Sequence, residues 1–219
     1  MEDSFLSTIE PFKIHPDHFW LDTPIKDPTS MKPEPDRDVL LIVGDAWNVI
    51  DDYKKYLETG VPCDLMCINY SPLIIPENWP INHYIAGDSH TKEMQKMSKS
   101  LPETTLKHCW NAESRHFDVR WARNSSKPWN GTTANLGIKI GIALGYMKIV
   151  LAGCPMDNQG NWYSKILKKN DVKRNKSHTP HLWKWTEIAS RPIGRFIRSY
   201  SGNTKDLFGE PTQQWLEDC

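Results

Sequence analysis

The stretch Gly131-Thr-Thr-Ala-Asn-Leu-Gly-Ile-Lys-Ile-Gly-Ile-Ala-Leu-Gly-Tyr-Met-Lys-Ile-Val-Leu-Ala-Gly-Cys-Pro-Met-Asp157 decides the fold, because it reads as a polar loop, a helix, a strand and a second polar loop. Thr132 and Thr133 are residue types that cap helix N-termini, and Gly145 suits the left-handed position at which a helix ends. The run 147–152 is short, apolar and unbroken, as in a strand buried on both faces. The stretch therefore predicts one helix-strand unit of a parallel sheet.

Similar apolar runs occur before and after this unit. They predict further strands at 38–43, 63–68, 83–87, 104–109 and 195–200. Helices are expected at 49–57, from Thr91 onward, at 181–190 and at 203–208, whereas 110–130 is expected to be irregular. Strands that alternate with helices indicate an α/β, Rossmann-like domain with a mostly parallel sheet flanked by helices and right-handed crossovers.

The chain has 219 residues, which is enough for one domain with a sizeable core. Residues 1–37 are rich in proline and predict an extended N-terminal arm. Residues 38–158 form the expected Rossmann-like nucleotide-binding core, and 159–180 form a basic flap. Residues 181–219 then complete the domain as helix, strand and helix.

Composition excludes some functions and favours others. Lys plus Arg and Asp plus Glu both number 27, so the zero net charge argues against a surface built as a whole for nucleic acid. Residues 165–198 are nevertheless strongly basic, which favours an anionic ligand there. The five cysteines form no CxxC pair, and neither a leader peptide nor an apolar run of membrane-spanning length is expected, so the prediction is a cytoplasmic protein with reduced thiols.

The ends of the predicted strands carry the candidate site. In open parallel sheets, ligands bind beyond the carboxyl ends of the strands. The residues at those ends are Gly44 and Asp45, Asn69, Tyr70 and Ser71, Asp88 to His90, and Gly153 to Asp157. Thr132 and Thr133 add a helix N-terminus, where free N–H groups favour an anion such as phosphate.

Three motifs in this pattern resemble a known superfamily. They are Gly44-Asp-Ala-Trp-Asn, Cys67-Ile-Asn-Tyr-Ser, and Gly131-Thr-Thr-Ala-Asn with the following Ala-Leu-Gly-Tyr-Met-Lys-Ile-Val-Leu-Ala-Gly. The chain is similar over about 38–157 to the Rossmann-like proteins that include bacterial lipo-oligosaccharide sialyltransferases and MptE-like hydroxymethylpterin diphosphokinases. The ending Arg198-Ser-Tyr-Ser-Gly-Asn-Thr-Lys-Asp-Leu-Phe-Gly-Glu-Pro most resembles small phage and prophage members. The Gly44 loop departs from the superfamily's usual Gly-x-Gly-Pro-Ser-Leu, because Asp45, Ala46 and Trp47 stand near its second glycine.

The resemblance to the sialyltransferases implies a cytidine nucleotide held by the first two strand-end loops and the helix N-terminus. It implies nucleotide-site roles for Gly44, Asn48, Asn69, Tyr70, Thr132, Thr133 and Asp157. It also implies a histidine general base, for which His178 and His181 are both candidates. From the residues alone, Asp45, Ser71 and Gly153 join the nucleotide-site candidates, and His90 joins the catalytic ones.

Each of these residues also has an ordinary structural explanation. Asn69 and Ser71 can end a strand in a turn, and the histidines can be exposed loop residues. Asp45, Asp88 and Asp157 have the ligand type that Mg²⁺ prefers, but each also suits a cap or turn, so no metal ligand is assigned. The basic flap could close over a nucleotide, contact a nucleic-acid backbone with Trp162, Trp183 and Trp185 stacking on bases, or be a solvated loop.

Three functional hypotheses follow. The first is a sialyltransferase-like transferase that binds a nucleotide or nucleotide-sugar donor and acts on an acceptor hydroxyl. The second is an MptE-like, Mg²⁺-dependent diphosphokinase with the metal on Asp45 or Asp157. The third is a non-catalytic phage protein that binds a nucleotide or DNA. The expected partners are a small-molecule nucleotide donor and either an anionic acceptor or nucleic acid.

Overall fold

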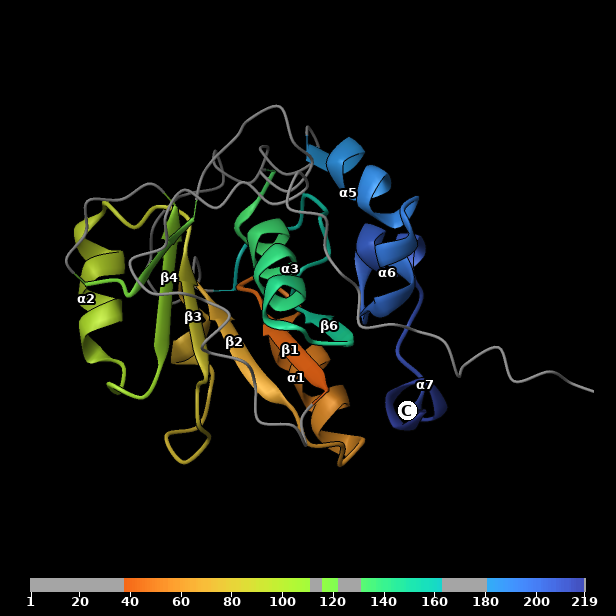
Figure 1. Cartoon of the computed structure of the whole chain (residues 1–219), viewed down its shortest axis with the longest axis horizontal. Helices are drawn as coiled ribbons and strands as arrows, with labels where there is room; N and C mark the ends of the chain where they lie inside the picture. Colours follow the sequence, from red (N-terminus) through yellow and green to blue (C-terminus); the bar gives the residue numbers. More distant parts are fainter. Residues whose placement is uncertain (1–37, 111–115, 122–130, 163–180, 219) are drawn as a thin grey trace, which may run out of the picture.

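The computed structural model describes residues 38–110, 116–121, 131–162 and 181–218. Within these ranges the strands form one seven-stranded sheet of order β5-β4-β3-β2-β1-β6-β7, and every neighbouring pair is parallel (Figure 1). The strands are β1 (Val39–Val43), β2 (Asp64–Ile68), β3 (His83–Ala86), β4 (Leu106–Trp110), β5 (Val119–Trp121), β6 (Lys148–Ala152) and β7 (Ile197–Ser199). The predicted α/β Rossmann-like fold is confirmed.

Helices cover both faces of the sheet. They are α1 (Val49–Glu58), α2 (Lys92–Ser100), α3 (Thr133–Leu144), α5 (Leu182–Ala189), α6 (Gly202–Phe208) and α7 (Gln213–Glu217), with 3₁₀ turns η3 (Ser71–Leu73) and η7 (Pro192–Phe196). Figure 1 shows α3 in front of the sheet and α1 behind it. Side chains of α3, α5 and α6 share one apolar cluster with alternate strand residues, and those of α1, α2 and α7 share the other.

The unit from Gly131 to Asp157 folds as its sequence predicts. The Thr132 side chain accepts a hydrogen bond from the Asn135 backbone N–H, which caps α3. Gly145 ends the helix in the left-handed region, at φ 94°. Between these ends most of α3 is buried, and β6 pairs with the interior strand β1 from Lys148 onward.

Some predicted boundaries change. Residues 119–121 were expected to be irregular but form the edge strand β5, which pairs with β4 through Cys109 and Arg120. Strand β4 begins at Leu106 rather than at 104, and the C-terminal segment adds η7 and α7. The predicted arm, residues 1–37, and most of the predicted flap, 163–180, lie outside the described residues. No helix in the described ranges is long and apolar enough to cross a membrane.

The direction of chain progression reverses beside β1. From β1 the strands succeed one another outward to β5, and α3 then returns the chain to β6 on the opposite side of β1. The connections from the carboxyl ends of β1 and β6 therefore leave over opposite faces of the sheet. This topological switch point leaves a crevice at which parallel α/β sheets place their ligands.

Candidate functional site at the switch point

A cavity of about 90 Å³ lies at this switch point. Its walls are the segments that follow β1, β2 and β6 and the first residues of α3. The lining residues are Gly44, Asp45, Ala46, Ile68, Asn69, Thr132, Thr133, Ala134, Gly153 to Asp157, Gly160 and Asn161. Complete small-molecule sites usually enclose about 300 Å³ or more, so these walls fit a phosphate-sized group rather than a whole nucleotide.

The structure brings most of the predicted nucleotide-site residues to this cavity. Those that line it are Gly44, Asp45, Asn69, Thr132, Thr133, Gly153 and Asp157. Asn48, Tyr70 and Ser71 are not among its lining residues. His90 lies exposed in the turn after β3 and does not line it either, and His178 is outside the described residues.

Glycine allows the ends of β1 and β6 to approach closely. The Gly44 N–H donates to the Ala152 carbonyl oxygen at 2.8 Å. A Cβ built on Gly44 would overlap the Gly153 carbonyl oxygen and lie 2.7 Å from Cys154 Sγ. Gly153 itself has φ 65°, and a Cβ there would lie 2.5 Å from Val49 Cβ. The crevice wall therefore requires glycine at both positions.

Backbone strain is concentrated at the same place. Among the described residues, Asn69 (φ 52°) and Met156 (φ 54°) are the non-glycine residues in the left-handed region. Both line the cavity. Asparagine tolerates this conformation, but methionine adopts it rarely. Each such conformation costs about 1–3 kcal/mol and persists only where the surrounding structure holds it. Residues of this kind cluster at functional sites.

Asp45 is the most perturbed acid of the cavity. Burial raises the pKa of its carboxyl group to about 7, although hydrogen bonds from its own backbone, the Tyr70 backbone and the Asn69 side chain oppose the shift. Asp157 is held differently, because its carboxylate accepts hydrogen bonds from Trp47 Nε1 at 3.1 Å and from the Gln159 backbone N–H at 3.0 Å. The cavity therefore holds two acids in different environments.

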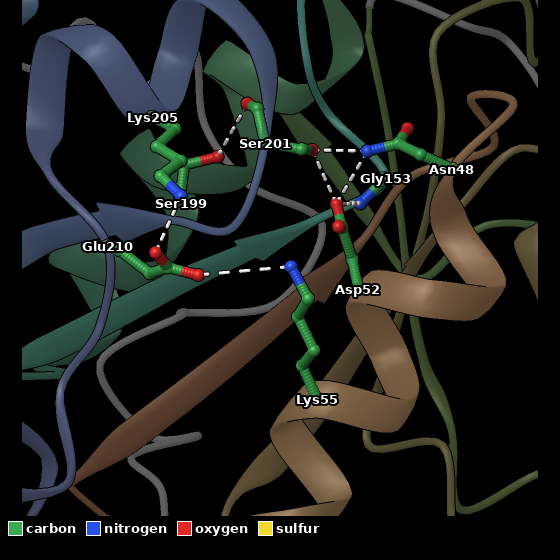
Figure 2. Close-up of polar contacts among 8 residues, drawn as sticks. All are labelled: Asn48, Asp52, Lys55, Gly153, Ser199, Ser201, Lys205 and Glu210. Carbon is green, nitrogen blue, oxygen red and sulfur yellow. Dashed lines mark hydrogen bonds and ion pairs between the residues drawn. The ribbon is translucent and has the colours of Figure 1, made fainter.

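Asp52 of α1 forms hydrogen bonds with Gly153, which lines the cavity, and with Asn48 and Ser201, as Figure 2 shows. Its Oδ2 accepts hydrogen bonds from the Gly153 N–H at 2.9 Å, Asn48 Nδ2 at 2.8 Å and Ser201 Oγ at 2.6 Å. Asn48 Nδ2 also contacts Ser201 Oγ. Asn48 therefore orients Asp52 and Ser201, and Asp52 orients the cavity wall.

The start of α6 holds the rest of that wall. Thr204 Oγ1 donates to the Cys154 carbonyl oxygen, and Asn203 Nδ2 donates to the Met156 carbonyl oxygen, both at 2.8 Å. Thr204 is fully buried. The Ser-Gly-Asn-Thr part of the C-terminal motif thus supports the strained loop after β6. The sequence motif marked the segment, but only the fold shows which loop it holds.

Ser71 supports the opposite wall in a similar way. Its hydroxyl donates to the Val43 carbonyl oxygen and accepts from the Ile68 N–H, both at 2.8 Å. The side chain is fully buried, so it joins the ends of β1 and β2 beneath the cavity. Tyr70 supplies a backbone hydrogen bond to Asp45.

The first turn of α5 lies beside the N-terminus of α3. A Cβ on Gly131, which precedes Thr132, would lie 2.9 Å from Lys184 Cδ. Lys184 is buried, and His181 is the half-buried N-cap residue of α5. Residues three apart share a helix face, so α5 presents a cation and an imidazole near α3. Sequence reasoning singled out His181 but noted Lys184 only as part of the basic segment.

The carboxylates considered for Mg²⁺ do not assemble into one group. Among the described residues, no cluster of three or more His, Cys, Asp and Glu side chains is placed to hold a metal ion. Asp88 is exposed and does not line the cavity, whereas Asp45 and Asp157 do. Asp45 instead accepts the hydrogen bonds described above.

Comparisons with known proteins do not assign this site. No protein-family model matches the sequence, and neither the curated proteins nor the solved structures gave a significant match.

Proposed function

We propose that this protein is a nucleotide- or nucleotide-sugar-binding transferase, similar to the sialyltransferases, which moves a group from that donor to an acceptor hydroxyl. The observation that carries the proposal is the cavity at the switch point, where the N-terminus of α3 meets the glycine-containing ends of β1 and β6. Helix N-termini and close backbone approach are the two features that phosphate binding uses most often.

The phosphate of the donor is placed against α3. The backbone N–H groups of Thr133 and Ala134 belong to the first helical turn and have no acceptor within the helix. The Thr132 and Thr133 hydroxyls and these amides would bind phosphate oxygens, and Lys184 would add positive charge from α5. The rest of the donor extends beyond the small cavity.

The general base is assigned to His178 or His181, as the resemblance implies. His181 stands at the start of α5, one turn before Lys184, and therefore near the proposed phosphate position. A neutral imidazole there would take the proton of the acceptor hydroxyl as the bond to the donor breaks. Turnover should fall strongly in a His178→Ala, His181→Ala double variant, and full turnover would contradict this assignment.

A thermal-shift screen tests donor binding. Nucleoside mono-, di- and triphosphates and nucleotide-sugars are compared with and without Mg²⁺, since a ligand at 100 times its Kd adds about 2.7 kcal/mol of stability. Mg²⁺-dependent stabilisation by ATP would instead support the diphosphokinase. DNA binding that weakens with salt, without turnover of any nucleotide-sugar, would support the non-catalytic protein.

Two cap variants locate the binding site. Thr132 caps α3, and Thr91 caps α2 in the same manner by accepting from the Met94 N–H. Either Thr→Val change should cost about 1 kcal/mol of stability. Only Thr132→Val is expected to weaken nucleotide binding as well, because α2 does not line the cavity. Equal nucleotide affinity in the two variants would place the site elsewhere.

A further inference from the structure

The charged side chains that line the cavity, within the described part of the chain, are unfavourable for an anion. Among its described lining residues are two acids, Asp45 and Asp157, and no Lys, Arg or His. The favourable partners are the amides at the N-terminus of α3. Lys184 packs beside Gly131 but does not line the cavity. An anion that enters such a small space comes within a few ångströms of Asp45, and like charges at that separation repel strongly in a partly desolvated site.

Among the described residues, the groups that face Asp45 do not offset this repulsion. Cys154, after β6, is a buried thiol whose pKa is raised by desolvation and by the Asp45 and Asp52 charges. Tyr84 of β3 is likewise buried, and desolvation raises its pKa, with the Asp45 charge adding to the shift. Both groups are neutral at physiological pH. Asp157, in the loop after β6, is the other acid of the lining, and the first turn of α3 contains no charged side chain. Protonation of the Asp45 carboxylate would therefore remove the unfavourable charge.

We propose that the cavity binds its anionic ligand together with one proton, which resides on the Asp45 carboxyl group. The protonated carboxyl then donates a hydrogen bond to an oxygen of the anion. The Asn69 side chain and the Tyr70 backbone hold this carboxyl group in place as hydrogen-bond donors. Burial, against the opposing hydrogen bonds, already brings the pKa of Asp45 to about 7, and a neighbouring anion raises it further. This inference rests on the proposed function, because it specifies how the same cavity accepts phosphate.

Calorimetric titration with sulfate tests the proposal, because sulfate remains a dianion over the whole range from about pH 6 to about pH 8. The affinity of the wild-type protein should fall as the pH rises, approaching about tenfold per pH unit where Asp45 is ionised. Titrations in two buffers with different ionisation enthalpies should show uptake of up to one proton at about pH 8. CMP is titrated in parallel as the nucleotide probe.

The Asp45→Asn variant is the decisive comparison. Asparagine has the shape of the protonated carboxyl and can donate from Nδ2, so this variant should bind sulfate without a pH slope and at least about tenfold more tightly than the wild type at about pH 8. Asp88→Asn removes an exposed strand-end carboxylate outside the cavity and should keep the wild-type slope. Thermal melts confirm that both variants are folded.

The outcomes separate the two proposals. If neither CMP nor sulfate binds at any pH, the proposed function and this inference both fail. If CMP and sulfate bind but Asp45→Asn retains the wild-type pH slope, the proposed function stands and the proton is not on Asp45. Loss of binding in Asp45→Asn together with a requirement for Mg²⁺ would also overturn the inference, because a cation would then bridge Asp45 and the anion.

Discussion

At the scale of single residues, the close approach of β1 and β6 at the switch point depends on the absence of a side chain at Gly44. Gly44 passes so close to the Gly153 carbonyl oxygen and Cys154 Sγ that a methyl group does not fit. Because the first obstacle is backbone, it cannot rotate away as a flexible side chain can. The shape of the cavity is thus determined by the lack of a Cβ at the end of β1.

Gly44→Ala should lower the free energy of unfolding by about 2–4 kcal/mol, as overpacking of a rigid site does, and it should abolish nucleotide binding. Gly137→Ala is the control. A Cβ at Gly137 meets only side-chain tips, at 3.3–3.4 Å, and alanine favours the helix by about 1 kcal/mol, so its stability should stay near that of the wild type. Urea unfolding measures both, and equal losses would contradict the explanation.

The raised pKa of Asp45 leads to a second prediction at this scale, on how stability depends on pH. Its folded-state pKa, about 7, is above the unfolded value, so the stability that its proton confers is complete at about pH 4 and is lost as the pH rises through 7. Asp45→Asn should therefore stabilise the protein by about 2 kcal/mol at pH 8, after allowance for partial exposure. The gain should disappear near pH 4. A gain independent of pH would show that the carboxyl is not desolvated.

At the scale of elements, a cluster of polar side chains crosses the sheet under α3. Trp121 Nε1 lies 3.1 Å from His108 Nδ1, His108 Nε2 lies 3.2 Å from His83 Nδ1, and His83 Nε2 lies 3.0 Å from Tyr146 Oη, which donates to Asp64 Oδ2 at 2.7 Å. The indole N–H can only donate, so His108 Nδ1 accepts and His108 Nε2 carries the proton that is donated to His83 Nδ1. By the same reasoning, His83 Nε2 donates to Tyr146 Oη. Both imidazoles are therefore neutral, with the proton on Nε2.

This row of hydrogen-bonded side chains makes the stability of the protein sensitive to acid. Desolvation lowers the pKa of His83 to about 4 and that of His108 well below its usual value. The unfolded chain then binds more protons between about pH 6.5 and 4, so stability falls as the pH drops through this window, by about 3 kcal/mol for His83. Urea unfolding in the Asp45→Asn background, which removes the opposing slope, should show the decline. His83→Gln should flatten it, and an unchanged slope would exclude the imidazole as its source.

The contact between α1 and the loop after β6 is a further test. Asp52→Ala would leave the buried Gly153 N–H without its acceptor and would remove the carboxylate that Asn48 and Ser201 share, so it should cost about 3 kcal/mol. Lys55→Ala, on the same helix, removes an exposed pair with Glu210 at 3.9 Å and should cost under about 1 kcal/mol. Thermal melts compare the two. If the Asp52 variant lost no more stability than the Lys55 variant, the buried network would not support the cavity wall.

These elements also show what the sequence can and cannot predict. Strands such as β1 and β6 and the helix α3 were predictable because buried elements appear as apolar runs with capping residues at their ends. β5 was not predictable, because it has only three residues and one of them, Arg120, is charged, so they form no apolar run. Asn48 and Ser71 follow strands just as Asp45 and Asn69 do, and only the folded backbone decides which side chains face the cavity and which turn inward. The His83–His108 pair depends on strand register, which the sequence does not reveal.

At the scale of the whole molecule, the charges balance. Lys plus Arg equals Asp plus Glu, so the formal net charge at pH 7 is zero. A protein without net charge lacks the mutual repulsion that keeps molecules apart in solution. Solubility should therefore be lowest near pH 7 and should rise at about one or two pH units to either side. Light scattering at fixed concentration measures this, and a minimum far from neutrality would contradict it.

The position of β6 between β1 and β7 has a consequence for synthesis on the ribosome. Val39, at the start of β1, pairs with Lys148, so this interior strand lacks one neighbour until most of the chain has been translated. A nascent chain that ends at Trp121 contains β1 to β5 but neither α3 nor β6. It exposes an unpaired edge of β1 that other strands can join. Ligand cannot stabilise this intermediate, because the cavity does not exist before β6 docks, so chaperone protection is expected to matter most during translation of residues 122–152.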